Sequence, residues 1–222
     1  GDLGAQVNIP TPQEIKALLA SLSGHWRPLL VTAVFTGMRS SELRGLRWQD
    51  VDLTRSEISV NQRADEFGQI GAPKSHAGKR TIPVPPLVIN ALKELKVGQP
   101  AGRSLVFANA DGAPRSHTNI INKGLIPAMK KAGVTVEEPG TNGDTRLKAK
   151  YTGLHALRHF YASWLINRKE DGGLALPPKV VQERLGHGSI VMTYDTYGHL
   201  FPRGDDAQEL ADAASALLAN AT

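Results

Sequence analysis

Apolar residues recur at helical spacing along most of this chain, and one central stretch breaks the pattern. The first helix is marked by a capping box, in which Thr11 precedes Glu14 by three residues and Pro12 takes the first helical position. Residues 57–84 instead contain short β-like runs separated by turns rich in glycine and lysine. The sequence therefore predicts a mainly α-helical α+β fold with a small three-stranded antiparallel β-sheet. Its strands are expected at residues 58–60, 69–70 and 81–84.

Glycine, proline and serine residues mark where the predicted helices begin and end. Gly37 ends an apolar helix expected at residues 26–35. Ser40 or Ser41 is expected to cap the short helix that follows. Residues 136–150 show no periodicity, and we expect a surface loop there. Other helices are predicted at residues 12–22, 86–96, 117–131, 154–167 with Thr152 as cap, 178–186, 189–196 with Ser189 as cap, and 205–219.

Composition limits the chemistry open to the chain. Its 222 residues are enough for a core of their own, and none is cysteine, which excludes disulfides, thiolate metal sites and a cysteine nucleophile. With no apolar run long enough to span a bilayer and no secretion leader, a cytoplasmic protein without membrane contact is expected. The 26 Lys and Arg residues exceed the 21 Asp and Glu residues, giving a net charge of +5. This balance permits a polyanionic partner.

Two histidines and an arginine lie close together in the helix predicted at residues 154–167. His155 and Arg158 are three residues apart, so their side chains leave one helix face and can converge on one ligand. His159 lies on the flanking side. Alone, this spacing also fits an exposed, ion-pairing arginine beside a packed histidine.

A histidine and a tyrosine follow at later helix junctions. His187 stands between Gly186 and Gly188, where the junction exposes backbone donors as well as the imidazole. Tyr197 comes ten residues later. Taken singly, that tyrosine fits core packing as well as it fits a nucleophile.

The order of six such side chains resembles the catalytic set of the tyrosine recombinases, also called the phage integrase family. The similarity spans residues 11–202, nearly the whole chain, and the ordered set is more specific than any one block. The six are Arg39, Lys74, His155, Arg158, His187 and Tyr197. They lie in the blocks Thr36-Gly37-Met38-Arg39-Ser40-Ser41-Glu42-Leu43, Pro73-Lys74-Ser75 with Arg80-Thr81-Ile82-Pro83, Leu154-His155-Ala156-Leu157-Arg158-His159, and Leu185-Gly186-His187-Gly188-Ser189.

The resemblance implies a site-specific DNA recombinase that uses no metal, cofactor or ATP. Tyr197 is then the nucleophile that attacks a DNA phosphodiester, leaving a 3′-phosphotyrosyl link and a free 5′ hydroxyl. Tyr194 is the alternative nucleophile. Arg39 and Arg158 are implied to hold the non-bridging oxygens of the scissile phosphate, which suits the planar fork of a guanidinium.

The same resemblance assigns proton transfers. His155 is implied to assist proton removal from Tyr197 or to hold the phosphate, and His187 to donate a hydrogen bond to another phosphate oxygen. Lys74 is implied to protonate the departing 5′ oxygen, with Lys79 as its competitor.

Supporting roles are expected for five further residues. Glu42 is expected to orient Arg39, with a surface ion pair as the alternative. His159 is expected to brace its helix. Additional DNA contacts are expected from Arg44, Lys79 and Arg80.

Three other functions stay open on the sequence. A type IB topoisomerase shares this chemistry, and a DNA-binding module would hold phosphates without cutting. A metal-dependent nuclease would use His155, His159 and His187, although no carboxylate set accompanies them.

The resemblance also predicts how the chain is organised. Residues 1–10 are expected to be a linker, residues 11–202 the catalytic domain, and residues 203–222 a helical tail that docks on a neighbouring protomer or folds back. A tetramer on double-stranded DNA is implied. Family members usually carry a helical domain before the catalytic one, so an isolated catalytic domain with weak DNA affinity is expected.

Overall fold

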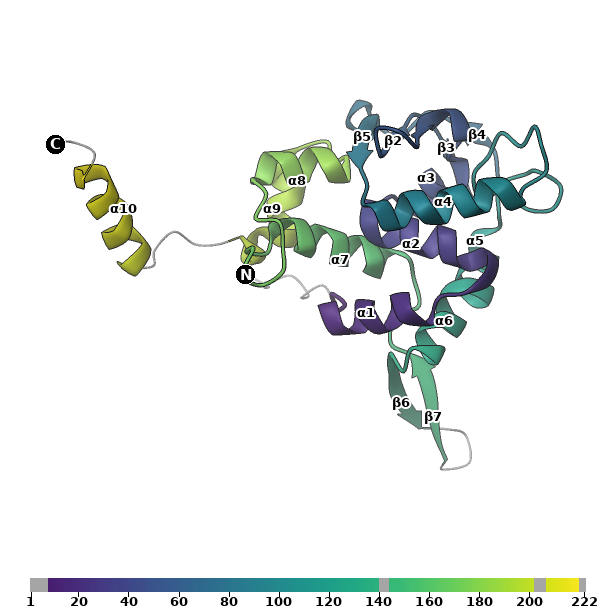
Figure 1. Cartoon of the computed structure of the whole chain (residues 1–222). Coiled ribbons are helices and arrows are strands. Elements are labelled where there is room, and N and C mark those ends of the chain that lie inside the picture. The colour runs from purple at the N-terminus through teal and green to yellow at the C-terminus, as the bar shows by residue number, and fades with distance from the viewer. Residues whose placement is uncertain (1–7, 140–143, 202–206, 220–222) are drawn as a thin grey trace.

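The computed structural model describes residues 8–139, 144–201 and 207–219, and helices form most of these ranges (Figure 1). Within them, no helix is both long and apolar enough to cross a membrane. The predicted mainly helical α+β fold is confirmed. The helices are α1 (Pro12–Ser21), α2 (Arg27–Thr36), α3 (Ser40–Gly45), α4 (Pro86–Gly98), α5 (His117–Asn119), α6 (Ile126–Lys131), α7 (His155–Ile166), α8 (Pro178–Leu185), α9 (Ile190–Tyr197) and α10 (Ala207–Ala219), and a π-helical segment (Ile120–Leu125) joins α5 to α6.

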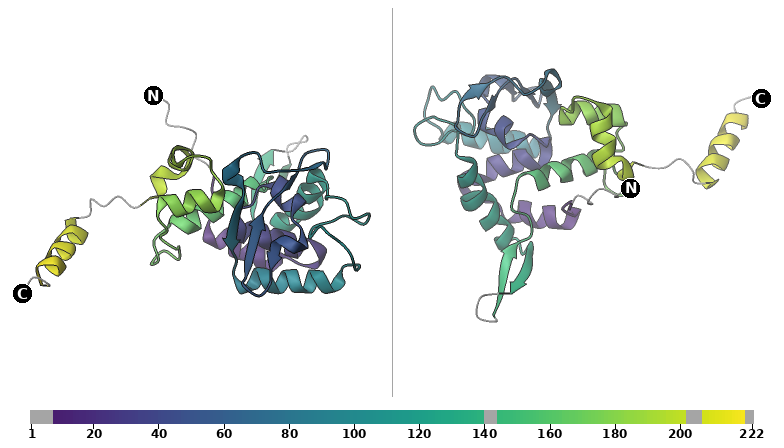
Figure 2. Two further views of the ribbon diagram at one scale, coloured as in Figure 1. Left: turned by 90° about the horizontal axis from the view of Figure 1, so that it is seen from above. Right: turned by 180° about the vertical axis from the view of Figure 1, so that it is seen from behind.

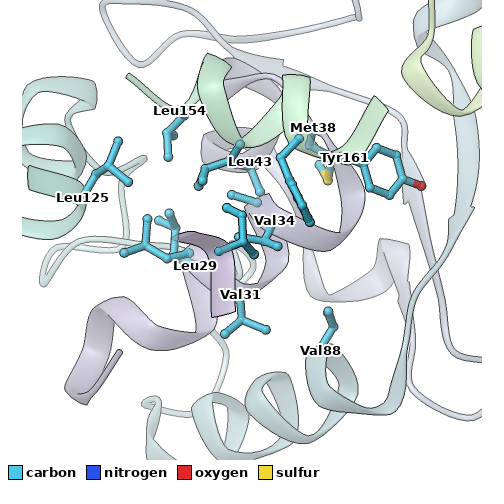
Figure 3. Packing of buried hydrophobic residues seen from close by; sticks show 14 of the residues in the cluster. Leu29, Val31, Val34, Met38, Leu43, Val88, Leu125, Leu154 and Tyr161 are labelled. Atoms are coloured by element: carbon cyan, nitrogen blue, oxygen red, sulfur yellow. The ribbon is translucent and has the colours of Figure 1, made fainter. Parts of the chain in front are cut away.

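Helix α2 is the centre of the hydrophobic core. All of its residues except Arg27 and Phe35 are buried, because α4 and α7 pack against it. Figure 3 shows its Leu29, Val31 and Val34 among buried side chains from the neighbouring segments. A helix that is apolar on all sides belongs in a core, so the sequence pattern at residues 26–35 is explained by this position.

The predicted three-stranded antiparallel sheet is present, with one strand different from the prediction. Its order is β1 (Val51–Asp52), β2 (Glu57–Val60) and β5 (Arg80–Pro83). Its inner residues are aligned, since Ile58 of β2 pairs with Val51 on one side and Ile82 on the other. The strand predicted at residues 69–70 is instead β4 (Ile70–Gly71), which pairs with β3 (Arg63–Ala64) in a separate ribbon. That ribbon is too polar and too short for its pairing to show in the sequence.

The loop predicted at residues 136–150 is wrong, because this segment forms a hairpin. Strand β6 (Thr135–Pro139) pairs antiparallel with β7 (Thr145–Ala149), and Figures 1 and 2 show the pair projecting from the body. Almost every residue in the two strands is partly or fully exposed. No buried face imposes an apolar alternation, so the sequence gives no strand signal. Residues 140–143 lie outside the described ranges.

Several predicted helix starts are corrected by the structure. Arg39, rather than Ser40 or Ser41, is the N-cap of α3, and Leu154, rather than Thr152, is that of α7. The caps predicted at Thr11 and Ser189 are confirmed, since each side chain accepts a backbone N–H three residues ahead. The expected linker lies mostly outside the described residues. Helix α10 corresponds to the expected C-terminal helix, and Figure 1 shows it apart from the body.

Two helices end on glycines in the left-handed conformation, and both ends face the same region. Gly37 follows α2 with φ 57°, and Gly186 follows α8 with φ 65°. Glycine adopts this conformation without a steric penalty, so the chain reverses sharply there. The two reversals bring Arg39 and His187 close to the ends of their preceding helices.

A third glycine allows α3 to lie directly on β3. A Cβ atom on Gly45 would approach the backbone of Arg63 and Ala64 to 2.7–2.8 Å, closer than packed atoms tolerate.

We predict that Gly45→Ala lowers the free energy of unfolding by about 1–3 kcal/mol through overpacking, measured by chemical denaturation. Gly98→Ala, at an exposed helix end with no atom within 4 Å of the added Cβ, is the matched control. Equal stability of the two variants would contradict the close packing of α3 on β3.

Candidate active site

Arg158 connects the ends of two helices from inside the protein. Its Nη1 donates to the carbonyl of Gly37 and its Nη2 to the carbonyl of Leu185, each at 2.6 Å. The residue is only 2% exposed. Carbonyls at helix C-termini carry partial negative charge, so a buried cation between them is stabilised. Burial, and secondly the charge of Arg39, lower its pKa to about 10, which leaves it charged at neutral pH.

Glu42 binds two further arginines, Arg39 and Arg80, near Arg158. Its carboxylate accepts Arg39 Nη1 at 2.9 Å and the Arg39 backbone N–H at 2.8 Å. Both terminal nitrogens of Arg80 donate to the same carboxylate, at 3.1 and 2.9 Å. Burial raises the pKa of Glu42, but Arg80 and then Arg39 outweigh it, and the pKa lies below its usual value. Glu42 is 2% exposed, so the alternative of a surface ion pair is wrong.

Arg39 remains the accessible member of this group. It reaches α8 through a hydrogen bond of 3.3 Å from Nη2 to the Gly186 carbonyl. Its side chain is 35% exposed, against 5% for that of Arg80. A phosphate oxygen can therefore approach Arg39 from solvent.

The burial of Arg80 and Arg44 conflicts with the expectation that they contact DNA. Arg80 also donates to the carbonyls of Arg184 and Gly78, so each nitrogen of its guanidinium already has a partner within the protein. Arg44 is 4% exposed and donates to the carbonyls of Arg115 and Asp65. Both guanidiniums hold segments of the protein together. Only Lys79, which is exposed, remains of the three expected additional contacts.

Tyr197 places its phenol inside the site. Its hydroxyl lies 2.6 Å from Nδ1 of His159, and the residue is 1% exposed. Burial raises the pKa of Tyr197 to about 12, against the opposing effect of Arg158. Burial and the charges of His155 and Arg158 lower the pKa of His159 to about 4. Near neutral pH this hydrogen bond therefore joins a neutral phenol to a neutral imidazole.

Tyr194, the alternative nucleophile, lies elsewhere. Its side chain is 48% exposed and its ring contacts Phe201, with 5.4 Å between ring centroids. Tyr197 instead lies parallel to the ring of His187, with 6.4 Å between centroids. Of the two tyrosines of α9, Tyr197 is the one that faces the histidines.

The other two histidines surround this pair. The ring of His155 packs edge-on against that of His159, with 4.7 Å between centroids. His187 is buried, and its Nδ1 lies 3.0 Å from the hydroxyl of Thr193. Burial, followed by the charges of Arg158 and Arg39, lowers the pKa of His187 to about 4. Partial burial and the same arginines lower the pKa of His155. The imidazoles are thus neutral at pH 7 in a strongly cationic setting.

Lys74 shares a cavity with Arg39. The two residues line a cavity of about 250 Å³ together with Glu42, and Lys79 is not among its lining residues. This shared cavity favours Lys74 over Lys79 as the residue nearest a phosphate held by Arg39.

Sequence reasoning missed two features of this site. The order of motifs indicated His155 as the partner of Tyr197, whereas the hydrogen bond comes from His159, one helical position after Arg158. Arg63, which lines the cavity of Lys74, was not singled out because no motif surrounds it. Among the described residues, no three His, Asp or Glu side chains form a metal-binding group.

Comparisons with known proteins identify relatives of this chain. The model of the phage integrase family matches residues 10–203. A tyrosine recombinase XerC-like protein of Caldanaerobacter subterraneus subsp. tengcongensis is 30% identical over 219 residues, covering 86% of this chain and 50% of the relative. The ICEBs1 integrase of Bacillus subtilis is 27% identical over 213 residues, covering 93% of this chain and 54% of the relative. The chain thus spans about half the length of these relatives.

Solved structures share the fold. The Tn1549 transposon integrase in complex with transposon right end DNA gives a TM-score of 0.69 at 23% identity, covering 98% of this chain and 67% of that one. XerA recombinase gives 0.64 at 20% identity, covering 95% and 65%. These matches confirm the predicted tyrosine recombinase catalytic-domain fold. The chain belongs to the phage integrase family.

Proposed function

We propose that this chain is the catalytic domain of a site-specific DNA recombinase that cuts and rejoins DNA through Tyr197. A buried phenol supports this proposal: Tyr197 is hydrogen-bonded to His159, its ring stacks beside that of His187, and Arg158 acts electrostatically on its hydroxyl. Arg39 acts on the same His187, and His155 packs against His159. Fixed cations stabilise the charge that accumulates on a phosphorane. The DNA complex of the Tn1549 integrase supports double-stranded DNA as the substrate.

The cleavage step follows from the position of Tyr197. Its oxygen attacks the scissile phosphorus, its proton passes to Nδ1 of His159, and the bond from phosphorus to the 5′ oxygen breaks. Lys74 supplies the proton that the departing 5′ oxygen takes up. The phosphodiester energy is kept in the 3′-phosphotyrosyl bond, so a 5′ hydroxyl from another strand reverses the step. Because Tyr197 is only 1% exposed, α9 has to shift, or the phosphate has to enter beside Arg39, before attack.

The cations divide their work according to burial. Arg39 contacts the phosphate directly, because its guanidinium is accessible. Arg158 keeps two donors on backbone carbonyls and acts on the phosphate from the interior wall. His155 and His187 donate hydrogen bonds to the phosphate, since Nδ1 of His159 is already engaged by the hydroxyl of the nucleophile. Incoming negative charge raises the pKa of all three histidines and so favours proton transfer.

The assembly on DNA is also a proposal. Leu210, Leu217 and Leu218 give α10 an apolar face that is exposed in the described part of the chain. Such a face suits a helix that docks on a neighbouring protomer in a tetramer.

Replacing the nucleophile tests the proposed function. We predict that Tyr197→Phe abolishes the covalent protein–DNA adduct on a nicked suicide duplex while DNA affinity stays within about twofold. The phenylalanine keeps the ring and loses only the attacking oxygen. Adducts are measured by denaturing gel and affinity by titration. Tyr194→Phe is the matched control and should form the adduct at the wild-type rate; loss of the adduct in that variant alone would assign the nucleophile to Tyr194.

The pH dependence of cleavage tests the acceptor. The pKa of His159 is about 4 before DNA binds, and the phosphate raises it from that low value. Wild-type adduct formation should therefore be nearly flat at the upper end of the range from pH 6 to 8 and fall at lower pH, where the acceptor is protonated. In His159→Phe, the phenol must lose its proton to solvent. Its single-turnover rate should be lower and should rise about tenfold per pH unit.

A histidine outside the site controls for general effects of this change. His25→Phe removes an imidazole that packs on Trp26, and its rate should follow the wild-type profile. A flat profile in His159→Phe as well would show that His159 positions the phenol without receiving its proton.

A further inference from the structure

Arg63 differs from the other arginines around the site in having a buried donor without an acceptor. Its Nε is buried and finds no hydrogen-bond partner within the part of the chain that the structure describes. Arg39, Arg80 and Arg158, in contrast, each donate to a carbonyl or a carboxylate. A buried donor left unpaired is costly, and a bound ion is one of the explanations for such a group in a native protein. The guanidinium of Arg63 is therefore a candidate for binding something that the free protein lacks.

The surroundings of Arg63 identify the ligand as an anion. Arg63 lines the cavity of about 250 Å³ that Arg39 and Lys74 also line. The carboxylate in its wall, Glu42, is already engaged by Arg39 and Arg80. Three cationic side chains around one cavity, with its carboxylate occupied, favour phosphate oxygens.

The backbone of Arg63 is fixed relative to Arg39. Gln62 donates to the Gly45 carbonyl at 2.8 Å, and Arg44 donates to the Asp65 carbonyl at 2.7 Å. Gly45 itself lies against the backbone of Arg63. Strand β3 is thus held on α3, the helix that begins beside Arg39, and the fold fixes the backbone of Arg63 relative to that of Arg39. Such a rigid support suits a binding group.

We propose that Arg63 binds a backbone phosphate of the cleaved strand next to the scissile phosphate. Arg39 and Lys74, which take the scissile phosphate in the proposed function, line this cavity together with Arg63, whereas Tyr197, His155 and Arg158 do not line it. The scissile phosphate, which must reach both Arg39 and Tyr197, therefore lies at the edge of the cavity, and the part lined by Arg63 is left for the next phosphate, since a DNA strand carries one phosphate per nucleotide. Arg63 sets the register of the strand on the nucleophile. This inference rests on the proposed function and adds a second phosphate site to it.

The experiment removes the guanidinium and the phosphate charge separately and together. Arg63→Met keeps the aliphatic stem and removes the charged fork. The DNA partners are suicide duplexes with a single methylphosphonate at the scissile phosphate or at one of the two neighbouring phosphates, since this group lacks the negative charge. Single-turnover rates of adduct formation are measured for wild type and variant on each duplex. Arg55→Met, at a side chain that is 74% exposed on the turn before β2, is the matched control.

The wild type should lose about tenfold or more in rate at one neighbouring methylphosphonate, as expected for a charge-assisted hydrogen bond. Arg63→Met should show a similar loss on unmodified DNA and no further loss at that position. Arg55→Met should keep the wild-type sensitivity. Arg63→Lys, which keeps the charge without the fork, should fall between wild type and Arg63→Met and serves in place of Arg63→Met if that variant does not fold.

Three results would overturn the inference. Wild-type rates in Arg63→Met, additive losses from the variant and the neighbouring methylphosphonate, or coupling only at the scissile phosphate would each remove the second phosphate site. The recombinase proposal would survive all three, because the wild type would still form the adduct. Absence of any wild-type adduct would instead reject both proposals.

Discussion

The site depends on one buried guanidinium that binds the ends of two helices. Arg158 donates to the carbonyls of Gly37 and Leu185, and so holds the C-termini of α2 and α8 together across the core. Arg39 lies two residues after the glycine that ends α2, and His187 directly follows the glycine that ends α8. These left-handed glycines turn the chain sharply in both places. Without Arg158 the two segments would present two negatively polarised helix ends to each other. The same residue thus builds the site and supplies part of its charge.

Most of the arginines in this region are engaged by groups of the protein itself. Glu42 neutralises Arg80 and orients Arg39, and Arg44 binds two backbone carbonyls. What remains for DNA is a small set of accessible cations, with Arg39 and Lys74 at one cavity. The order of motifs in the sequence identifies the cationic residues. It does not distinguish those that bind other groups of the protein from those that are accessible to DNA.

The sequence predicts the parts of the fold that have a periodic or stereochemical signal. The capping box at Thr11, the glycine that ends α2 and the apolar pattern of α2 all correspond to observed features. The β6–β7 hairpin and the β3–β4 ribbon escape prediction, because exposed, short strands need no alternation of apolar residues. The family resemblance named the site residues, but the partner of Tyr197 depends on how α7 and α9 pack. The sequence motif alone therefore does not show whether His155 or His159 contacts the hydroxyl of Tyr197.

In the proposed recombinase, the side chains around Tyr197 and Arg39 surround one DNA phosphate. A crystal structure of the Tyr197→Phe variant bound to an uncleaved duplex measures this arrangement directly. A backbone phosphate is expected within hydrogen-bond distance of Arg39, with the ring at position 197 and the imidazoles of His155 and His187 around it. A DNA backbone that crosses another face of the protein, leaving Arg39 and Lys74 facing solvent, would contradict it.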